Sequence, residues 1–218
     1  MSSVPFLRHT VADSVFLELK KRIISGEYAA GFQLRQDQLA TELGASRIPI
    51  REALLRLEAE GLVDIAAHKG GVVRGLSLAE ATEFFNLRIL IECNLLKDAL
   101  PNMTSEDFDQ AEESLHKFDH MVISGQNIEQ WAKLNWEFHN HFYRAANQPH
   151  TLKILQTLHS NTDRYIRQQL LREGAPERAH EEHAELIELG RRGDITGAAK
   201  LLKKHISAAY KQVKSALV

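Results

Sequence analysis

The sequence has few of the residues that mark secreted, fibrous or membrane proteins. Its single cysteine among 218 residues, Cys93, excludes an internal disulfide and is typical of a reducing compartment. Five prolines and 12 glycines argue against a fibrous or disordered chain. No stretch approaches the roughly 20 apolar residues that span a bilayer, and the first residues contain no signal-peptide core. We therefore expect a globular, cytoplasmic protein with no membrane partner.

An excess of positive charge is also lacking. The chain carries 27 lysines and arginines against 29 acidic residues, a net charge of -2 with histidine neutral. Overall electrostatics do not favour a nucleic-acid partner, so any DNA-binding site must depend on where particular arginines lie. Histidine, by contrast, is abundant, and nine of the 11 histidines fall between His116 and His205.

The N-terminal third has the pattern of a winged helix–turn–helix. Apolar residues at helical spacing predict helices over about residues 10–25, 35–43 and 47–60, with a loop between the first two. Ser46 precedes the third helix as a suitable N-cap. Short β-branched runs on either side of residues 66–71 then predict a two-stranded hairpin. Three helices followed by such a hairpin make a DNA-binding unit.

The start of the predicted third helix carries candidate base contacts. Arg47 and Arg51 are four residues apart and share one helix face. A recognition helix presents its N-terminal residues to the major groove, where an arginine can bond both acceptors of guanine. The Ser46 hydroxyl and the neighbouring amide groups suit a phosphate. Taken alone, however, two arginines on an amphipathic helix more often form a solvated face.

From Ser77 onward the sequence predicts only helices. A capping box at Ser77 and Glu80 begins the first of them. We expect the domain boundary near Gly75, with domains at 1–75 and 76–218. The connections are short, as in an all-α bundle. The expected fold is mainly α, with six bundle helices at about residues 77–100, 105–124, 127–146, 150–172, 177–192 and from 195 nearly to the end.

Three histidines fall on the apolar faces of three different bundle helices. These are His139, His183 and His205, and Asn135 lies one turn before the first. Burying three imidazoles without partners is unfavourable, whereas a divalent cation would satisfy them, with Asn135 supplying an oxygen. The alternative is three separate hydrogen-bonded core histidines, and spacing alone does not decide between the two. We expect His159 at the surface.

Several runs of the N-terminal domain match a known pattern: Gly31-Phe-Gln-Leu34, Gln38-Leu39-Ala40-Thr-Glu-Leu43-Gly44-Ala-Ser46-Arg47-Ile-Pro49-Ile-Arg51-Glu52-Ala53-Leu54, and Glu60-Gly61-Leu62-Val63. Over about residues 10–75 the chain thereby resembles the DNA-binding domain of the GntR family of bacterial transcription regulators. The resemblance implies a homodimer on a palindromic DNA operator. It also implies that Arg47 and Arg51 read the bases and that Arg35 touches phosphate. The hairpin tip, with His68, Lys69 and Gly70, would form the wing that approaches the duplex.

Motifs in the helical half are sparser: Arg88-x-x-x-Glu92, Asn135-Trp-Glu-Phe138-His139, and His183 followed 22 positions later by His205. They resemble the FadR-type effector domain, called FCD, and six helices point to its VanR-like subgroup. The resemblance implies a divalent transition metal (Zn, Ni or Mn) on Asn135, His139, His183 and His205. Asn135 stands where metal-binding members have aspartate, and its neutral amide is a weaker donor.

The same resemblance implies a small carboxylate effector. Arg88 is similar to the family arginine that faces the pocket and could hold the carboxylate, with Arg164 and Arg167 as further candidates. The alternative for Arg88 is a surface ion pair with Glu92, four residues along the same helix.

The sequence thus predicts a metabolite-responsive DNA-binding transcription regulator, a repressor rather than an enzyme, whose carboxylate effector changes operator affinity. Two alternatives stay open. A three-histidine metal centre could activate water in a hydrolase, although His180-Glu-Glu-His183 lacks the spacing of a zinc-protease motif. A DNA-binding adaptor would use the bundle only to dimerise, and would bind neither metal nor effector.

Overall fold

The computed structural model describes residues 10–66, 70–124, 128–170 and 174–218. The chain divides into two compact units, the first ending at Gly75 and the second beginning at Leu76. Within the described residues, none of the helices is long and apolar enough to cross a membrane.

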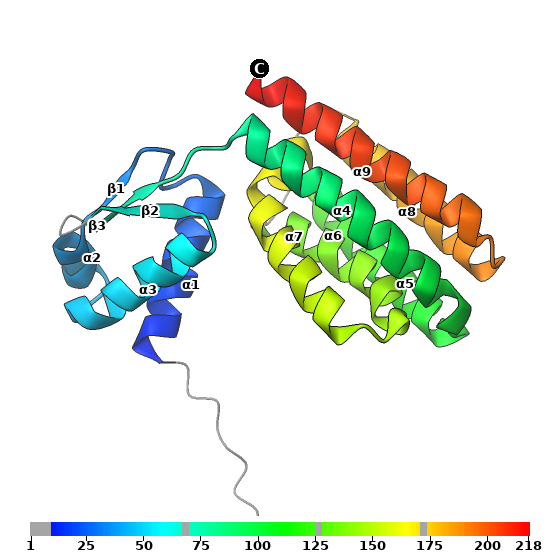
Figure 1. Ribbon diagram of the computed structural model, residues 1–218, viewed down its shortest axis with the longest axis horizontal. Coiled ribbons are helices and arrows are strands. Elements are labelled where there is room, and N and C mark those ends of the chain that lie inside the picture. Colours follow the sequence, from blue (N-terminus) through cyan, green and yellow to red (C-terminus); the bar gives the residue numbers. More distant parts are fainter. Residues whose placement is uncertain (1–9, 67–69, 125–127, 171–173) are drawn as a thin grey trace, which may run out of the picture. The chain divides into compact units, whose positions relative to one another are not determined.

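The N-terminal unit combines three helices with a small antiparallel sheet (Figure 1). The sheet has three strands in the order β1-β3-β2, where two were expected. The additional strand β1 pairs with β3 in the segment predicted as a loop, and it buries Leu34 completely. Two residues are too few to show a strand period in the sequence. The elements are α1 Val11–Ser25, β1 Gln33–Leu34, α2 Gln36–Glu42, α3 Arg47–Ala59, β2 Val63–Ala66 and β3 Gly70–Val73.

Helix α3 is held against the core by one apolar face. Ile50, Ala53, Leu54 and Leu57 recur at helical spacing and are buried, which leaves the opposite face exposed. Ser46 occupies the N-cap position as predicted, but its side chain makes no capping hydrogen bond. The first turn of α3 is therefore displayed on a helix whose position is fixed by packing.

Gly70 has a structural role in the sheet. Its φ is +92°, in the region that favours glycine, and a Cβ there would collide with the backbone carbonyl oxygen of Leu34. Gly70 is also buried. Gly70 thus packs beside the backbone of Leu34, and its predicted approach to a duplex stays a prediction.

The C-terminal unit is a bundle of six α-helices among its described residues, as predicted (Figure 1). Helix α4 begins at Ser77, whose hydroxyl accepts a hydrogen bond from the amide of Glu80. The Ser77 amide donates to the Tyr165 hydroxyl over 3.1 Å and so ties the start of α4 to α7. The helices are α4 Leu78–Ala99, α5 Ser105–Ser124, α6 Ile128–Tyr143, α7 Pro149–Leu170, α8 Ala175–Arg191 and α9 Ile195–Leu217.

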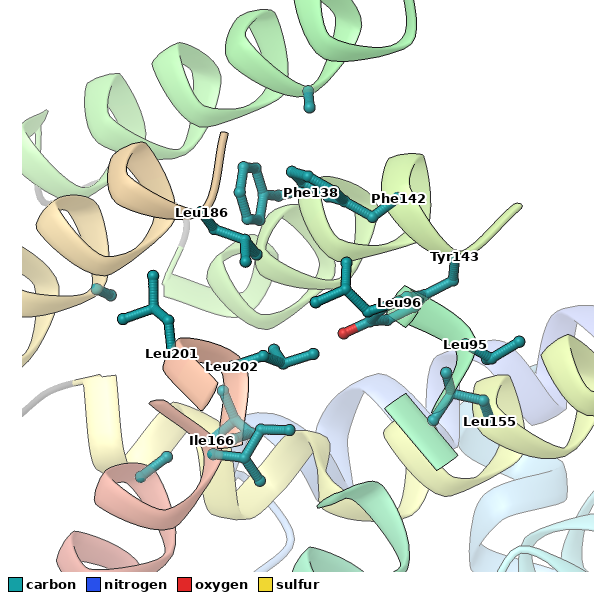
Figure 2. Packing of buried hydrophobic residues seen from close by; sticks show 14 of the residues in the cluster. Leu95, Leu96, Phe138, Phe142, Tyr143, Leu155, Ile166, Leu186, Leu201 and Leu202 are labelled. Carbon is teal, nitrogen blue, oxygen red and sulfur yellow. The ribbon is translucent and has the colours of Figure 1, made fainter. Parts of the chain in front are cut away.

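A single apolar core joins these helices. Figure 2 shows Leu96 from α4, Phe138 and Phe142 from α6, Leu186 from α8 and Leu202 from α9 packed together, and all five are buried. Each such side chain contributes roughly 1.5–3 kcal/mol on burial. Because α6, α8 and α9 share this core, polar side chains on their inner faces are held at fixed positions inside the bundle.

Candidate functional site

Three histidines from three helices meet inside the bundle. His139 lies on α6, His183 on α8 and His205 on α9, and each offers a ring nitrogen within 4.8 Å of the others. The ring centres of His139 and His183 are 4.9 Å apart, as are those of His183 and His205. The residues that sequence periodicity placed on inward faces thus converge on one point.

Two of these imidazoles have no hydrogen-bond partner in the described part of the chain. Both ring nitrogens of His139 and both of His183 are buried without a hydrogen bond among the described residues. Burial, together with the neighbouring imidazoles, holds the pKa of each ring well below its ordinary range. The rings are therefore neutral near pH 7, which is the form that binds a metal ion.

The ring of His183 is also fixed by packing. Phe138 stacks on it with a centroid distance of 4.2 Å and an interplanar angle of 29°, and Phe118 meets it edge-on at 6.0 Å. The orientation of this imidazole is therefore set by apolar neighbours and needs no bound ligand.

His205 differs because it has a carboxylate partner. Its Nδ1 lies 2.8 Å from Glu182 Oε2. Burial alone would raise the pKa of Glu182, but the hydrogen bond from His205 and the positive charges of Arg178 and Lys204 together outweigh burial and lower the pKa. An ionised carboxylate only accepts, so Nδ1 carries the proton and Nε2 keeps its lone pair for a metal. Sequence reasoning missed Glu182, because its neighbour His183 was the residue with the evident periodicity.

The donor set fits a divalent transition ion. Asn135 is buried one turn before His139 and lines a pocket with Arg88 and His205. Three imidazoles and an amide oxygen suit zinc, nickel or manganese. The unpartnered nitrogens of His139 and His183 are the observation behind this fit, since buried polar atoms in folded proteins almost always have partners.

A buried network lies beside this pocket. Glu92 is fully buried and accepts hydrogen bonds from Arg88 Nε at 2.7 Å, Tyr143 Oη at 2.6 Å and His159 Nε2 at 3.1 Å. Burial by itself would raise the pKa of Glu92, but the Arg88 guanidinium and His159 hold it well below its usual range. Burial raises the pKa of Tyr143, and the charge of Glu92 raises it further.

One alternative and one expectation about this network are wrong. The Arg88–Glu92 ion pair exists, but it is buried, with Arg88 1% exposed, so it is not a surface pair. His159 is buried against the Trp136 ring at a centroid distance of 4.3 Å and is not at the surface. Burial lowers its pKa, so it donates to Glu92 as a neutral ring. Its polar neighbours come from other helices, which sequence periodicity does not show.

The guanidinium of Arg88 uses only part of its hydrogen-bonding capacity within the described structure. Its Nε is bound to Glu92, whereas its Nη1 is buried without a hydrogen-bond partner among the described residues. Arg88 therefore lines the pocket with a donor nitrogen, Nη1, that the described part of the protein does not use. Arg164 and Arg167 lie on α7, but their side chains fall outside the described part of the structure.

The N-terminal unit displays the predicted DNA-contact residues on its surface. Arg35, Ser46, Arg47 and Arg51 are all exposed. Arg35 is the N-cap of α2. Arg47 Nε lies 2.5 Å from Asp37 Oδ1 of α2, and both side chains stay largely in solvent. The predicted wing residues His68 and Lys69 lie outside the described residues.

Comparison with known proteins assigns the chain. The family model for bacterial regulatory proteins of the GntR family matches residues 11–73, and that for the FCD domain matches residues 83–208. The chain belongs to the GntR family and carries an FCD domain. Among its relatives, BphR of Paraburkholderia xenovorans is an uncharacterized HTH-type transcriptional regulator, 26% identical over 98% of this chain and 89% of BphR.

Solved structures share the same fold. Escherichia coli McbR/YncC superposes with a TM-score of 0.79 at 22% identity, covering 96% of this chain and 99% of McbR/YncC. The metal-free FCD domain of TM0439 gives a TM-score of 0.54 at 22% identity, covering 66% of this chain and 97% of that domain. FCD domains are thus associated with metal binding. This GntR regulator has transcriptional regulators as relatives, which implies that it is not an enzyme, and its subgroup stays a prediction.

Proposed function

We propose that this GntR regulator is a metabolite-responsive repressor. Its N-terminal unit would bind a palindromic operator, and its FCD domain would hold a metal ion and a small carboxylate effector that lowers operator affinity. The observation that carries this proposal is the trio of converging imidazoles, two of which are fully buried with no hydrogen-bond partner among the described residues. An adaptor that only dimerised would gain nothing from them, since they are unfavourable to bury.

The metal would be held by His139, His183 and His205, with Asn135 as an oxygen donor. Zinc, nickel and manganese are the candidates. When bound, the ion would supply a positive charge that attracts an anionic oxygen. The chain's own part is to present the neutral rings of His139 and His183 together with His205, which Glu182 orients.

The carboxylate would bind next to Arg88. Because Nε of this arginine is occupied by Glu92, the guanidinium is held in one orientation, with Nη1 free of protein partners. A carboxylate that accepts from Nη1 would satisfy a buried donor, and charge-assisted hydrogen bonds of this kind are strong.

The DNA contacts would come from the exposed start of α3. Arg47 and Arg51 would read bases, while Ser46 and Arg35 would touch phosphate. A palindromic operator requires a symmetric dimer. Exposed apolar side chains on α4, Leu87 and Leu90, are candidates for the surface that a second copy covers.

A single set of measurements tests the proposal. Purified protein is analysed for metal, and operator affinity is measured with and without small carboxylates by fluorescence anisotropy, with oligomeric state from light scattering. We expect up to one divalent ion per chain, its loss in His139→Ala, and its retention in His116→Ala, a matched change at an exposed histidine of α5. The absence of metal and of any carboxylate response would favour the adaptor. Metal-dependent hydrolysis would favour the enzyme.

A further inference from the structure

The pocket proposed for the effector contains a second arginine, which sequence reasoning did not single out. Arg178 lies in the first turn of α8 and lines this pocket together with Arg88 and His205. Its Nη2 donates to the Gln212 side chain over 2.9 Å, whereas its Nε is buried without a hydrogen-bond partner among the described residues. Two arginines on different helices thus each contribute a buried, unpartnered N–H group at one pocket.

The two arginines of the pocket differ in how directly their charges are paired. The Arg88 guanidinium is paired with Glu92, and Glu182 is hydrogen-bonded to His205. In the described part of the chain, the side-chain partner of Arg178 is the neutral amide of Gln212. The N-terminal turn of α8 adds the positive end of a helix dipole to this guanidinium. The positive charge of Arg178 also lowers the pKa of Glu182, four residues along α8, but its Nε has no acceptor in the described structure. A negative group placed beside Arg178 would therefore gain a direct charge-assisted hydrogen bond.

Apart from the amide of Asn135, the remaining lining is apolar. Ile166, Ile206 and Ala209 contribute to the pocket walls, and all three are buried. Methylene groups suit such walls, whereas hydroxyl groups placed there would lose water without gaining hydrogen bonds. The pocket thus combines separate anion-binding donors with an aliphatic lining.

We propose that the effector is a short aliphatic dicarboxylate, one carboxylate of which accepts from Arg88 Nη1 and the other from Arg178 Nε. The inference rests on the proposed carboxylate-binding function and specifies its ligand. A monocarboxylate would leave one buried donor unpaired, and that loss is unfavourable. Arg178 is then the residue that selects two negative groups over one.

The test compares acids of equal carbon number by isothermal titration calorimetry. Full-length protein, metal-free or loaded with Zn²⁺ and dialysed free of excess ion, is titrated with succinate against butyrate and with glutarate against pentanoate. We expect at least one diacid to bind about tenfold or more tightly than its monoacid in at least one of these states. In Arg178→Gln this preference should fall to within about threefold.

Matched controls separate a specific contact from simple charge. Arg192→Gln removes the same charge from the exposed C-terminal end of α8 and should keep the diacid preference. Sulfate carries two charges on one centre and should not reproduce diacid binding. If circular dichroism shows that Arg178→Gln does not fold, Arg178→Lys replaces it, and we expect a reduced diacid preference because the Nε donor is lost.

The possible results separate the dicarboxylate inference from the proposed carboxylate-binding function on which it rests. The dicarboxylate assignment would be overturned if monoacids and diacids bound equally, if sulfate bound as tightly as the diacids, or if the variants of Arg178 kept the full diacid preference. The proposed carboxylate effector would not be affected by these results. Failure of every acid to bind and to alter operator affinity would overturn both.

Discussion

The Nδ1 atom of His205 and the Oε2 atom of Glu182 lie 2.8 Å apart, on two helices that pack against each other inside the bundle. This hydrogen bond fixes which nitrogen of His205 carries the proton. The other nitrogen, Nε2, is thereby directed to the cluster formed with His139 and His183. A carboxylate behind a ligating histidine is a common way to orient the ring and to raise its basicity.

Glu182→Ala should therefore weaken metal binding without removing any of the proposed ligands. Loss of an outer carboxylate typically costs about 10–100-fold in metal affinity. Affinity is measured by competition with a chromophoric chelator. Glu185→Ala, a change three residues along the same helix, serves as the control. Equal metal affinity in Glu182→Ala and wild type would contradict this role.

Arg47→Ala and Arg51→Ala should each weaken operator binding by about 1–3 kcal/mol, because each side chain would lose a bidentate contact with a base. The operator is first obtained by selection from random DNA, and affinity is then measured by fluorescence anisotropy at fixed salt. Circular dichroism should be unchanged, since both side chains are exposed. Unaltered operator affinity in both variants would remove α3 from the proposed interface.

Asp37→Asn should strengthen DNA binding a few-fold. Asp37 pairs with Arg47 in the free protein, so this ion pair must be broken or shared when Arg47 reaches a base. Exposed ion pairs contribute about 0–1 kcal/mol, and the same carboxylate repels phosphate. The effect is read from operator titrations beside Glu113→Gln, which alters an exposed carboxylate in the FCD domain. Weaker binding in Asp37→Asn would show that the carboxylate positions Arg47 instead of competing for it.

Gly70→Ala should destabilise the N-terminal unit by at least about 2 kcal/mol, because an alanine there would be both strained in φ and in collision with the Leu34 carbonyl. Hydrogen exchange of amides in α1 and α3 measures this loss. In Gly75→Ala the new Cβ would lie 3.7 Å from Ala30 Cβ, an ordinary contact. Its effect should stay within about 0.5 kcal/mol. Similar protection in both variants would contradict the steric argument.

The stability of the FCD domain should fall as pH decreases below about 6.5, the ordinary pKa of histidine. Burial lowers the pKa of His159 in the folded state. Between the folded and unfolded pKa values only the unfolded chain binds this proton, so protonation favours unfolding there, and the stability is fully present above the unfolded pKa.

His159→Gln keeps a donor to Glu92 and removes this titration. Its unfolding free energy should depend less steeply on pH, by up to about 1.4 kcal/mol per pH unit below pH 6.5. Urea unfolding in chelator, followed by the fluorescence of Trp131 and Trp136, measures the difference. The other buried histidines contribute the same pH dependence to the unfolding free energies of wild type and His159→Gln, so their contribution cancels in the difference. Parallel pH profiles would show that His159 is already protonated in the fold.

Long helices were predictable from the sequence because their apolar residues repeat over several turns. The six bundle helices and α3 fall close to their expected bounds. Strand β1 was missed because two residues carry no period. Its presence depends on the pairing of Leu34 with Gly71, a contact between distant parts of the sequence.

Within the candidate site, periodicity indicated which histidines face inward, and packing of α6, α8 and α9 brings them together. It could not identify their partners. Glu182, His159 and Arg178 act through groups on other helices, and such contacts exist only after the bundle is assembled. For Arg88 the resemblance indicated a place in the pocket, but spacing alone could not show that its ion pair with Glu92 is buried beside it.

The stacking of Phe138 on His183 has a consequence for the folding of this protein without metal. The His183 imidazole loses its rotamer entropy when the apolar core forms. Binding of a metal ion therefore does not carry this entropy cost. Zinc fingers, in contrast, unfold when their ion is withdrawn. A chelator should remove the proposed ion from this FCD domain and leave the helices assembled. Metal occupancy could then change with the cellular supply of metal without unfolding and degradation of the regulator.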